Sequence, residues 1–448
     1  MPVFEMPLEE LRHYKGCSPC PGDFKEYWRE ALGELEATGL AYTCTPAAFE
    51  APGVECYDLW FVGTGGARVH CMFLKPAQFS GKIPAVAVFH GYMHHGGEWF
   101  ERLPYVYAGN AVLVMEARGQ GGLSEDVYAG AGPTLFGHVV RGVRDKDPHK
   151  LYYRDVYLDA AKAVRILMSM DFVDEARVAT TGKSQGGALA LAAAALTPEV
   201  KLCAPIYPFL CDFRRVAQLD LMKDAYEGFS YYFKKCDPTH AHEQEFFERL
   251  GYIDLQNHAS AIRAQVFWQT GLMDTLCPPS AQFSAYNKLT GRKEMKLYPE
   301  YGHEQIPYTN DTVLGRRFKM ATNALNNDFL LNIQSIYPSL TKAEKKVADY
   351  TLQNSKAVRF LSITDLAEAC HVSLTSVFRF CKVLKLQGYQ EFKVQLALSI
   401  QEEGQGEEIE LLPAAVTKAD SVPTAAKKLL QSHINALSET HALVDEAA

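Results

Sequence analysis

The sequence lacks the long apolar run that a membrane span requires. No stretch of about 18 consecutive apolar residues occurs in the 448-residue chain, so we expect no transmembrane helix. The opening stretch, MPVFEMPLEELRHYKG, also lacks a basic region followed by an apolar core. That pattern predicts no signal peptide.

The chain also lacks a net positive charge and a regular spacing of cysteines. The net charge is -8, which disfavours nonspecific binding of the whole chain to nucleic acid, although one domain can differ from the rest. The 11 cysteines are odd in number and scattered, as is typical of reduced thiols. The CxxC pair Cys17 and Cys20 has no second pair and no strand before it, so we do not favour a redox or zinc role there.

Short apolar runs and helical patterns alternate between Ile83 and Tyr298. Segment 55–76 alternates polar and apolar residues around a Gly-Gly turn, which predicts an antiparallel hairpin at the edge of a sheet. The later runs are almost continuously apolar and end in Gly or Pro, as buried parallel strands do. They are Ala85–Gly91, Ala111–Gly119, Ala176–Gly182, Lys201–Pro208, Ala264–Gly271 and Met295–Pro299. Helical patterns such as Tyr153–Met170 separate several of them, so the region predicts a doubly wound α/β sheet.

The segment GKSQG at 182–186 has two incompatible interpretations. Gly-Lys-Ser ends a phosphate-binding loop, whereas Gly-x-Ser-x-Gly presents a nucleophilic serine. A phosphate-binding loop needs glycine where Arg177 stands, and the following VATT is typical of a strand. The hydrolase interpretation fits the context, because a strand leads into Ser184 and a helix of small residues follows. We therefore favour the nucleophile.

An acid and a histidine follow Ser184 in the chain order of α/β hydrolases. Asp274 and His303 each come just after a predicted strand. Taken singly, Asp274 would be a loop-capping carboxylate and His303 a surface residue. Together they predict a catalytic triad, with His303 as general base and then acid, and with Asp274 orienting its ring. Such a triad completes the chemistry without a cofactor.

Two backbone amides are the candidates for the oxyanion hole. One is the N–H of Gln185, which follows the nucleophile, and the other is the N–H of Tyr92, in the loop after an early strand. A metal cluster is the alternative for the loop's side chains, which are His90, His94, His95 and Glu98. The sequence completes no HExxH motif, because Phe246 and Pro307 occupy the last positions, and we expect no metal site.

Several motifs together resemble carbohydrate esterase family seven, the acetyl xylan esterases and cephalosporin C deacetylases. They span about residues 1–320 and are the opening segment, FHGY, Arg118-Gly119-Gln120, GKSQGG, GLMDTLCPPS and YGHE. The resemblance implies an α/β-hydrolase fold, the triad named above, deacetylation of small acetylated sugars and cytoplasmic homohexamers with active sites facing an internal cavity. It also implies that Arg118 braces the fold. Lys183 and the loop MHHGGE depart from the usual family pattern, which leaves the leaving-group pocket and the role of Lys183 open.

Strand patterns stop after about Asn323, and short helices follow. Residues 364–370, a turn at 371–373 and residues 374–384 have helix-turn-helix spacing. We expect the second helix to expose Ser373, Thr375, Ser376 and Arg379 to base edges and Lys382 and Lys385 to phosphates. Residues 336–400 carry nine basic and five acidic residues, a net charge of +4, which leaves -12 for the rest of the chain. By spacing alone, a helical interaction bundle with solvated lysines is an equal alternative.

The helical region also resembles the N-terminal domain of RpiR-type transcriptional regulators, over about residues 328–400. The resemblance implies DNA binding. Such regulators normally continue into a sugar-isomerase-type domain, whereas here residues 401–448 predict an acidic linker and a terminal helix. The expected domains are therefore 1–325, 328–400 and 401–448, and the helix-turn-helix domain is either active or an idle fusion.

The sequence as a whole predicts a serine esterase with an appended helix-turn-helix domain. Hydrolysis would pass through an acetyl-Ser184 intermediate. The main alternative is a DNA-binding regulator whose esterase-like part senses a sugar. A peptidase or lipase on the same fold is a third possibility, because a fold does not determine its substrate.

Overall fold

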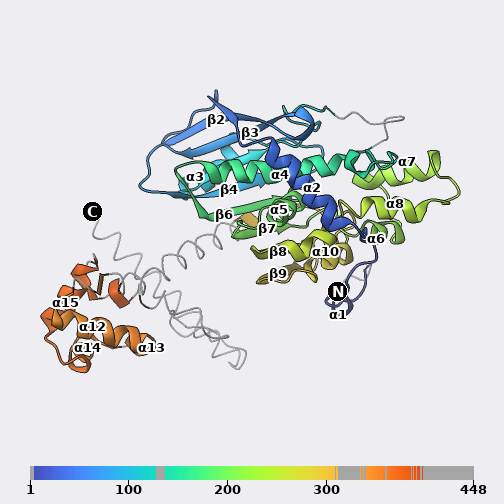
Figure 1. Cartoon of the computed structure of the whole chain (residues 1–448). Coiled ribbons are helices and arrows are strands. Elements are labelled where there is room, and N and C mark those ends of the chain that lie inside the picture. Colours follow the sequence, from blue (N-terminus) through green and yellow to red (C-terminus); the bar gives the residue numbers. More distant parts are fainter. Residues whose placement is uncertain are drawn as a thin grey trace, which may run out of the picture. The chain divides into compact units, whose positions relative to one another are not determined.

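The computed structural model divides into two compact units, Met1–Ala321 and Thr322–Ala448, which we call the N-terminal unit and the C-terminal unit (Figure 1). It describes residues 5–127, 137–307 and 309–310. Within 333–396 it describes all positions except 334–335, 338–339, 359–360, 385, 387, 390 and 394–395. The linker and terminal helix predicted for 401–448 lie outside the described residues. Among those described, no helix is long and apolar enough to cross a membrane.

A nine-stranded mixed sheet forms the centre of the described N-terminal unit, in the order β1-β2-β3-β5-β4-β6-β7-β8-β9. The pairs β1–β2, β2–β3 and β3–β5 are antiparallel, and every pair from β5 to β9 is parallel. The strands are β1 (Tyr42–Pro46), β2 (Val54–Val62), β3 (Arg68–Pro76), β4 (Ile83–Phe89), β5 (Ala111–Met115), β6 (Val173–Lys183), β7 (Leu202–Ile206), β8 (Gln265–Gly271) and β9 (Lys293–Tyr298). This is the α/β-hydrolase arrangement, and it confirms the predicted fold class.

One prediction about the sheet edge is wrong. The hairpin of β2 and β3 forms as expected, but β1 pairs with the outer side of β2 and is itself the edge. All five residues of β1 are exposed. A short exposed strand carries no apolar alternation, and the sequence pattern therefore gave no signal for it.

Alternate residues of the parallel strands feed two cores, one on each face of the sheet. In β4, Ala85 and Ala87 pack with the helices α4 and α5, whereas Val86 and Val88 pack with α3. This two-sided burial explains why the strand is apolar throughout. The flanking helices are α1 (Leu8–Leu11), α2 (Phe24–Ala37), α3 (Leu103–Tyr107), α4 (Tyr152–Ser169), α5 (Gln185–Leu196) and α10 (Pro279–Tyr286).

A helical insertion lies between β7 and β8 and has no counterpart in the sequence-based prediction. It comprises α6 (Phe213–Gln218), α7 (Glu227–Lys235), α8 (Glu243–Leu250) and α9 (Leu255–His258). The ring of Phe229 is central to it and meets four other rings edge-on, those of Phe213, Tyr226, Phe246 and Phe247. Edge-to-face contacts of this kind add to the burial of the rings themselves. Single-turn 3-10 helices also occur, at Thr64–Gly66, Trp99–Arg102, Pro148–Lys150, Asp224–Tyr226 and Ala259–Ala261.

The C-terminal unit is helical where it is described, as predicted. Its helices are α12 (Lys342–Gln353), α13 (Ser355–Val358), α14 (Ile363–Ala369) and α15 (Leu374–Val383). Thr341 caps α12 with Glu344, and Ser362 caps α14 with Asp365, so each forms a reciprocal capping box. Buried side chains of α12, α14 and α15 share one core, which includes Val347, Leu366, Val377 and Phe380.

Candidate active site

Ser184 stands on a strained turn between β6 and α5. Its φ is 55°, in the left-handed region that a residue with a side chain rarely adopts, and its N–H donates to the carbonyl of Ile206. The turn requires small neighbours: a Cβ on Gly186 would lie 2.0 Å from the carbonyl oxygen of Phe89. The close packing of α5 against β4 therefore holds the serine out of the strand line.

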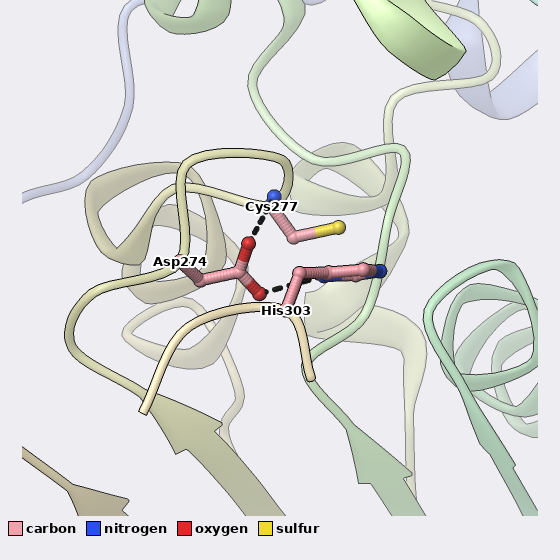
Figure 2. A group of neighbouring side chains, drawn as sticks. All are labelled: Asp274, Cys277 and His303. Carbon is pink, nitrogen blue, oxygen red and sulfur yellow. Dashed lines mark hydrogen bonds and ion pairs between the residues drawn. The ribbon is translucent and has the colours of Figure 1, made fainter. Parts of the chain in front are cut away.

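Three side chains that are far apart in the sequence meet at this turn. His303 Nε2 lies 3.0 Å from Ser184 Oγ, and His303 Nδ1 lies 2.8 Å from Asp274 Oδ2. Asp274 follows β8 and His303 follows β9, so parallel neighbouring strands deliver both to the same edge of the sheet (Figure 2). The structure thus brings Ser184, Asp274 and His303 into one continuous hydrogen-bond chain.

Asp274 is fully buried, and its two oxygens have separate partners. Oδ1 accepts the backbone N–H groups of Leu276 at 2.9 Å and Cys277 at 2.7 Å, while Oδ2 faces the His303 ring (Figure 2). Amide donors stabilise the ionised carboxylate without competing for the imidazole. The tight turn after β8 therefore fixes the direction of the Asp274 carboxylate.

Tyr207 supports the histidine and was not found from the sequence. It follows β7, its ring lies 4.8 Å from the His303 ring between centroids, and its φ of 34° is positive. Burial raises the pKa of Tyr207, so its phenol stays neutral. The sequence around Tyr207 predicts only the end of a strand. No local pattern indicates that its ring contacts His303.

The side chains of Gln120 and Gln185 form a reciprocal amide pair. Each Nε2 donates to the other's Oε1, at 2.8 and 2.9 Å. Gln120 Oε1 also accepts the N–H of Met93, and Gln185 Oε1 also accepts the hydroxyl of Tyr153. The pair therefore links the helix that begins after Ser184 to the loop that begins at Tyr92.

The backbone amides of Tyr92 and Gln185 donate to no group among the described residues. Gln185 occupies the first turn of α5, where amides lack intrahelical acceptors. The Tyr92 hydroxyl, by contrast, accepts the N–H of His138, and its ring packs on Phe209. The two amides named from the sequence are thus unoccupied donors beside the nucleophile turn and in the loop tied to it.

His90 is a neutral structural residue. Its Nδ1 donates to the carbonyl of Gly91 at 2.7 Å, and its Nε2 accepts the N–H of Ala117 at 2.9 Å. Burial lowers the pKa of His90 to about 4. Since both ring nitrogens are engaged, His90 has none left for the metal cluster that His94, His95 and Glu98 would have completed.

Arg118, Gly119 and Gln120 occupy the loop after β5. The guanidinium of Arg118 is buried and pairs with both oxygens of Asp159 in α4, at 2.6 and 2.7 Å. This fork geometry suits a buried ion pair. Gly119 has a φ of 63° and lies against the side chain of Asp126. Arg118 therefore links the loop after β5 to α4. Gln120 contacts the nucleophile turn by its hydrogen bonds to Gln185.

Lys183 is half-buried, and its ammonium group has a side-chain partner. Its Nζ donates to Oε1 of Gln305 at 2.6 Å, and burial lowers its pKa. Gln305 is two residues beyond His303. The lysine therefore links the serine turn to the histidine loop, a contact between chain segments that the sequence gives no means of pairing.

In the C-terminal unit, α15 presents most of the residues named from the sequence. Thr375, Arg379 and Lys382 are exposed, and Ser373 is the exposed N-cap of the helix. The expectation that Ser376 is exposed is wrong: it is half-buried, and its hydroxyl lies 3.0 Å from that of Ser373. Lys385 lies outside the described residues. The same helix exposes three apolar side chains that were not predicted from the sequence, Leu374, Phe378 and Val383.

Comparison with known proteins assigns the two units separately. The model of the acetyl xylan esterase family, AXE1, matches residues 1–320, and the model of the helix-turn-helix domain of the rpiR family matches residues 327–403. The chain belongs to the acetyl xylan esterase family. Its N-terminal unit is the esterase-family part, and the resemblance to acetyl xylan esterases and to RpiR-type regulators is confirmed.

Individual relatives agree with this division. Acetyl xylan esterase 1 from Thermoanaerobacterium sp. JW/SL YS485 is 45% identical, with a TM-score of 0.68 over 70% of this chain and 98% of that one. Acetyl esterase Axe7A of Xylanibacter ruminicola is 28% identical over 65% of this chain and 65% of its own length. The regulator HexR of Pseudomonas aeruginosa is 36% identical over 26% of this chain and 40% of its own. The chain thus spans less than two thirds of each of these two curated relatives.

Proposed function

We propose that the N-terminal unit is a serine esterase that removes acetyl groups from small acetylated carbohydrates. The observation that carries the proposal is the hydrogen-bond chain from Ser184 Oγ through His303 to buried Asp274, at 3.0 and 2.8 Å. A protein that only binds a sugar does not require a hydroxyl, an imidazole and a carboxylate joined in one hydrogen-bond chain. The names of the related acetyl xylan esterase and acetyl esterase support an acetylated sugar as the substrate class.

The chemistry begins with Ser184. His303 Nε2 accepts the hydroxyl proton as Oγ attacks the ester carbonyl, and Asp274 stabilises the imidazolium that forms. The N–H groups of Gln185 and Tyr92 stabilise the oxyanion of the tetrahedral intermediate. His303 then returns the proton to the departing sugar oxygen, which leaves acetyl-Ser184. A water molecule, deprotonated by His303, attacks this second ester and releases acetate.

Gln120 and Gln185 prepare the site for that charge. Their reciprocal amide pair holds the Met93 amide, next to Tyr92, at a fixed place relative to α5. Donors fixed before the reaction cost no reorganisation when the oxyanion forms. In this proposal the last residue of the Arg-Gly-Gln motif is therefore a positioning residue.

Substitution of Ser184 tests the activity. Removing the nucleophile of a triad lowers kcat by a factor on the order of 10⁶, so Ser184→Ala should abolish turnover of an aryl acetate. Ser169→Ala, at the end of α4 and remote from the triad, is the matched control and should keep the wild-type rate. Near-wild-type turnover by Ser184→Ala would disprove the proposal and leave a sensor or a different nucleophile.

The acyl and alcohol parts of the substrate need separate measurements. Rates for acetyl, butyryl and longer esters of one alcohol distinguish a deacetylase from a lipase, and an amide series tests the peptidase alternative. Acetylated xylo-oligosaccharides compared with cephalosporin C then separate the two activities of the family. We expect acetyl esters of the sugars to be hydrolysed fastest. We also expect a homohexamer, which sedimentation velocity tests.

We further propose that the C-terminal unit binds DNA through α15. The specific observation is the exposure of Thr375, Arg379 and Lys382 on the second helix of a helix-turn-helix pair, where recognition side chains reach base edges. Titration of the full chain against genomic fragments over a range of salt concentrations tests it. A sequence-specific site that survives added salt supports a regulator, and binding without sequence preference supports an idle fusion.

A further inference from the structure

Cys277 is a buried thiol at the triad that the proposed esterase mechanism does not use. It is 1% exposed, its N–H donates to Asp274 Oδ1, and its side chain interacts with that of Ser184. Figure 2 shows the sulfur over the His303 ring, which is seen edge-on, and the Asp274 carboxylate at one end of that ring. The turn after β8 therefore delivers two potential ligands, Asp274 and Cys277, to one place.

A group of three different potential metal ligands occurs here: Asp274, Cys277 and His303. One donor atom from each residue lies within 4.8 Å of the other two, and no other group of three such side chains occurs in the described part of the chain. The set offers one sulfur, one nitrogen and one oxygen, the donors that Zn²⁺ combines in proteins, whereas Mg²⁺ and Ca²⁺ prefer oxygen alone. The thiolate and the carboxylate together would neutralise a divalent charge in this buried position.

We propose that these three residues form an inhibitory site for a thiophilic divalent cation such as Zn²⁺. On binding, the Cys277 thiol releases its proton to water and bonds to the metal as a thiolate. The His303 ring binds as the neutral base through one nitrogen and keeps its single proton on the other. The Ser184 hydroxyl or a water molecule can supply a fourth ligand.

Inhibition follows whichever ring nitrogen of His303 binds. If Nε2 binds the metal, its lone pair cannot accept the Ser184 proton. If Nδ1 binds, the ring proton moves to Nε2, which again has no lone pair for the serine. In both cases Asp274 turns to the cation and the hydrogen-bond chain is broken. This inference rests on the proposed esterase function, because its activity readout is the loss of that function.

Zinc sensitivity of the full chain is the first test. We expect micromolar Zn²⁺ to lower aryl acetate turnover at least tenfold, a chelator to restore it, and Mg²⁺ at the same concentration to have no effect. Cys277→Ala and Cys277→Ser, each compared with its own metal-free rate, should lose this sensitivity. Cys203→Ala, a buried thiol in β7, and Cys44→Ser, an exposed thiol in β1, should keep it. Equal sensitivity of the Cys277 variants and the wild type would overturn the site.

A spectroscopic readout separates the metal site from the esterase. Co²⁺ bound to a thiolate gives a charge-transfer absorption in the near ultraviolet, and we expect it in Ser184→Ala but not in a Cys277→Ala chain. If Ser184→Ala keeps its turnover yet shows the band, the esterase proposal fails and the metal site stands. If Ser184→Ala is inactive but neither it nor the wild type shows the band, the metal site fails and the esterase stands.

Discussion

The candidate residues of the two units differ in burial and in how far apart they stand in the sequence. In the N-terminal unit Asp274 is fully buried, and the hydrogen-bond chain joins residues that are separated by as many as 119 positions. In the C-terminal unit the described candidate residues lie on or just before one helix, α15, and most are exposed. Catalysis requires side chains held in register by the whole sheet, whereas nucleic-acid recognition requires side chains left free to meet a partner.

This difference has energetic consequences. Replacing a buried polar group leaves its partners unsatisfied and disturbs several contacts at once. Replacing an exposed group removes one contact with the partner and little from the fold. We therefore expect substitutions in the N-terminal unit to have large effects on one activity, and substitutions on α15 to have modest effects on the other.

After Ser184→Ala, the largest effect is expected for Asp274→Asn. The amide cannot hold the His303 ring in the required tautomer, and kcat should fall by about 10⁴-fold. DNA affinity of the same variant should equal that of the wild type. Asp171→Asn, an exposed position before β6, is the matched control for turnover. Loss of DNA binding in Asp274→Asn would mean that the two units do not act separately.

Gln120→Ala should have an intermediate effect. It removes the amide pair with Gln185 and frees the Met93 amide, but it leaves the triad in place. We expect kcat to fall by roughly tenfold to a hundredfold with little change in KM, less than for outright removal of an oxyanion donor. Steady-state kinetics measure both constants. Exposed Gln218→Ala is the control, and a change confined to KM would contradict the positioning role.

On α15, Arg379→Ala should weaken discrimination between sites by about 1–3 kcal/mol, and Lys382→Ala should weaken all sites equally and lower the salt slope by about one. Fluorescence anisotropy with specific and scrambled duplexes measures both. Ester hydrolysis should be unchanged in each variant. If the two variants behave alike on both duplexes, α15 does not read bases.

Acid sensitivity should be the smallest effect, and it should concern the N-terminal unit. Burial lowers the pKa of His90, His138 and His258 to about 4 in each case. Because the unfolded chain takes up protons near pH 6.5, stability that is present above this pH is lost as the pH falls towards 4. We expect the thermal midpoint of this unit to fall by several degrees over that range.

Tryptophan fluorescence can follow this transition, because all 4 tryptophans of the chain lie before residue 322. His258→Gln, which cannot take up a proton, should flatten the pH dependence. A midpoint that is constant from neutral pH to pH 4 would contradict the neutral, buried state of these histidines.

Local patterns were sufficient for the parallel strands, because burial on both faces makes almost every residue of such a strand apolar. They did not reveal β1, which is exposed along its whole length. The insertion α6–α9 was also missed, although α7 and α8 each bury one face, at Phe229 and Phe233 and at Phe246, Phe247 and Leu250. The contacts of Gln120, Tyr207 and Cys277 could not be predicted from the sequence either. Each depends on a partner brought close by a different strand.

The sequence by itself determined the fold class, the two-part organisation and the candidates Ser184, Asp274 and His303, since residue type, order and spacing along the chain carry that information. Only the tertiary structure decided how those residues meet. It paired Gln120 with Gln185, occupied both nitrogens of His90, linked Lys183 to Gln305 and set the Cys277 thiol beside the triad. The physical reason is that parallel strands align their carboxyl ends whatever their separation in sequence, and the contacts made at that edge belong to no single segment.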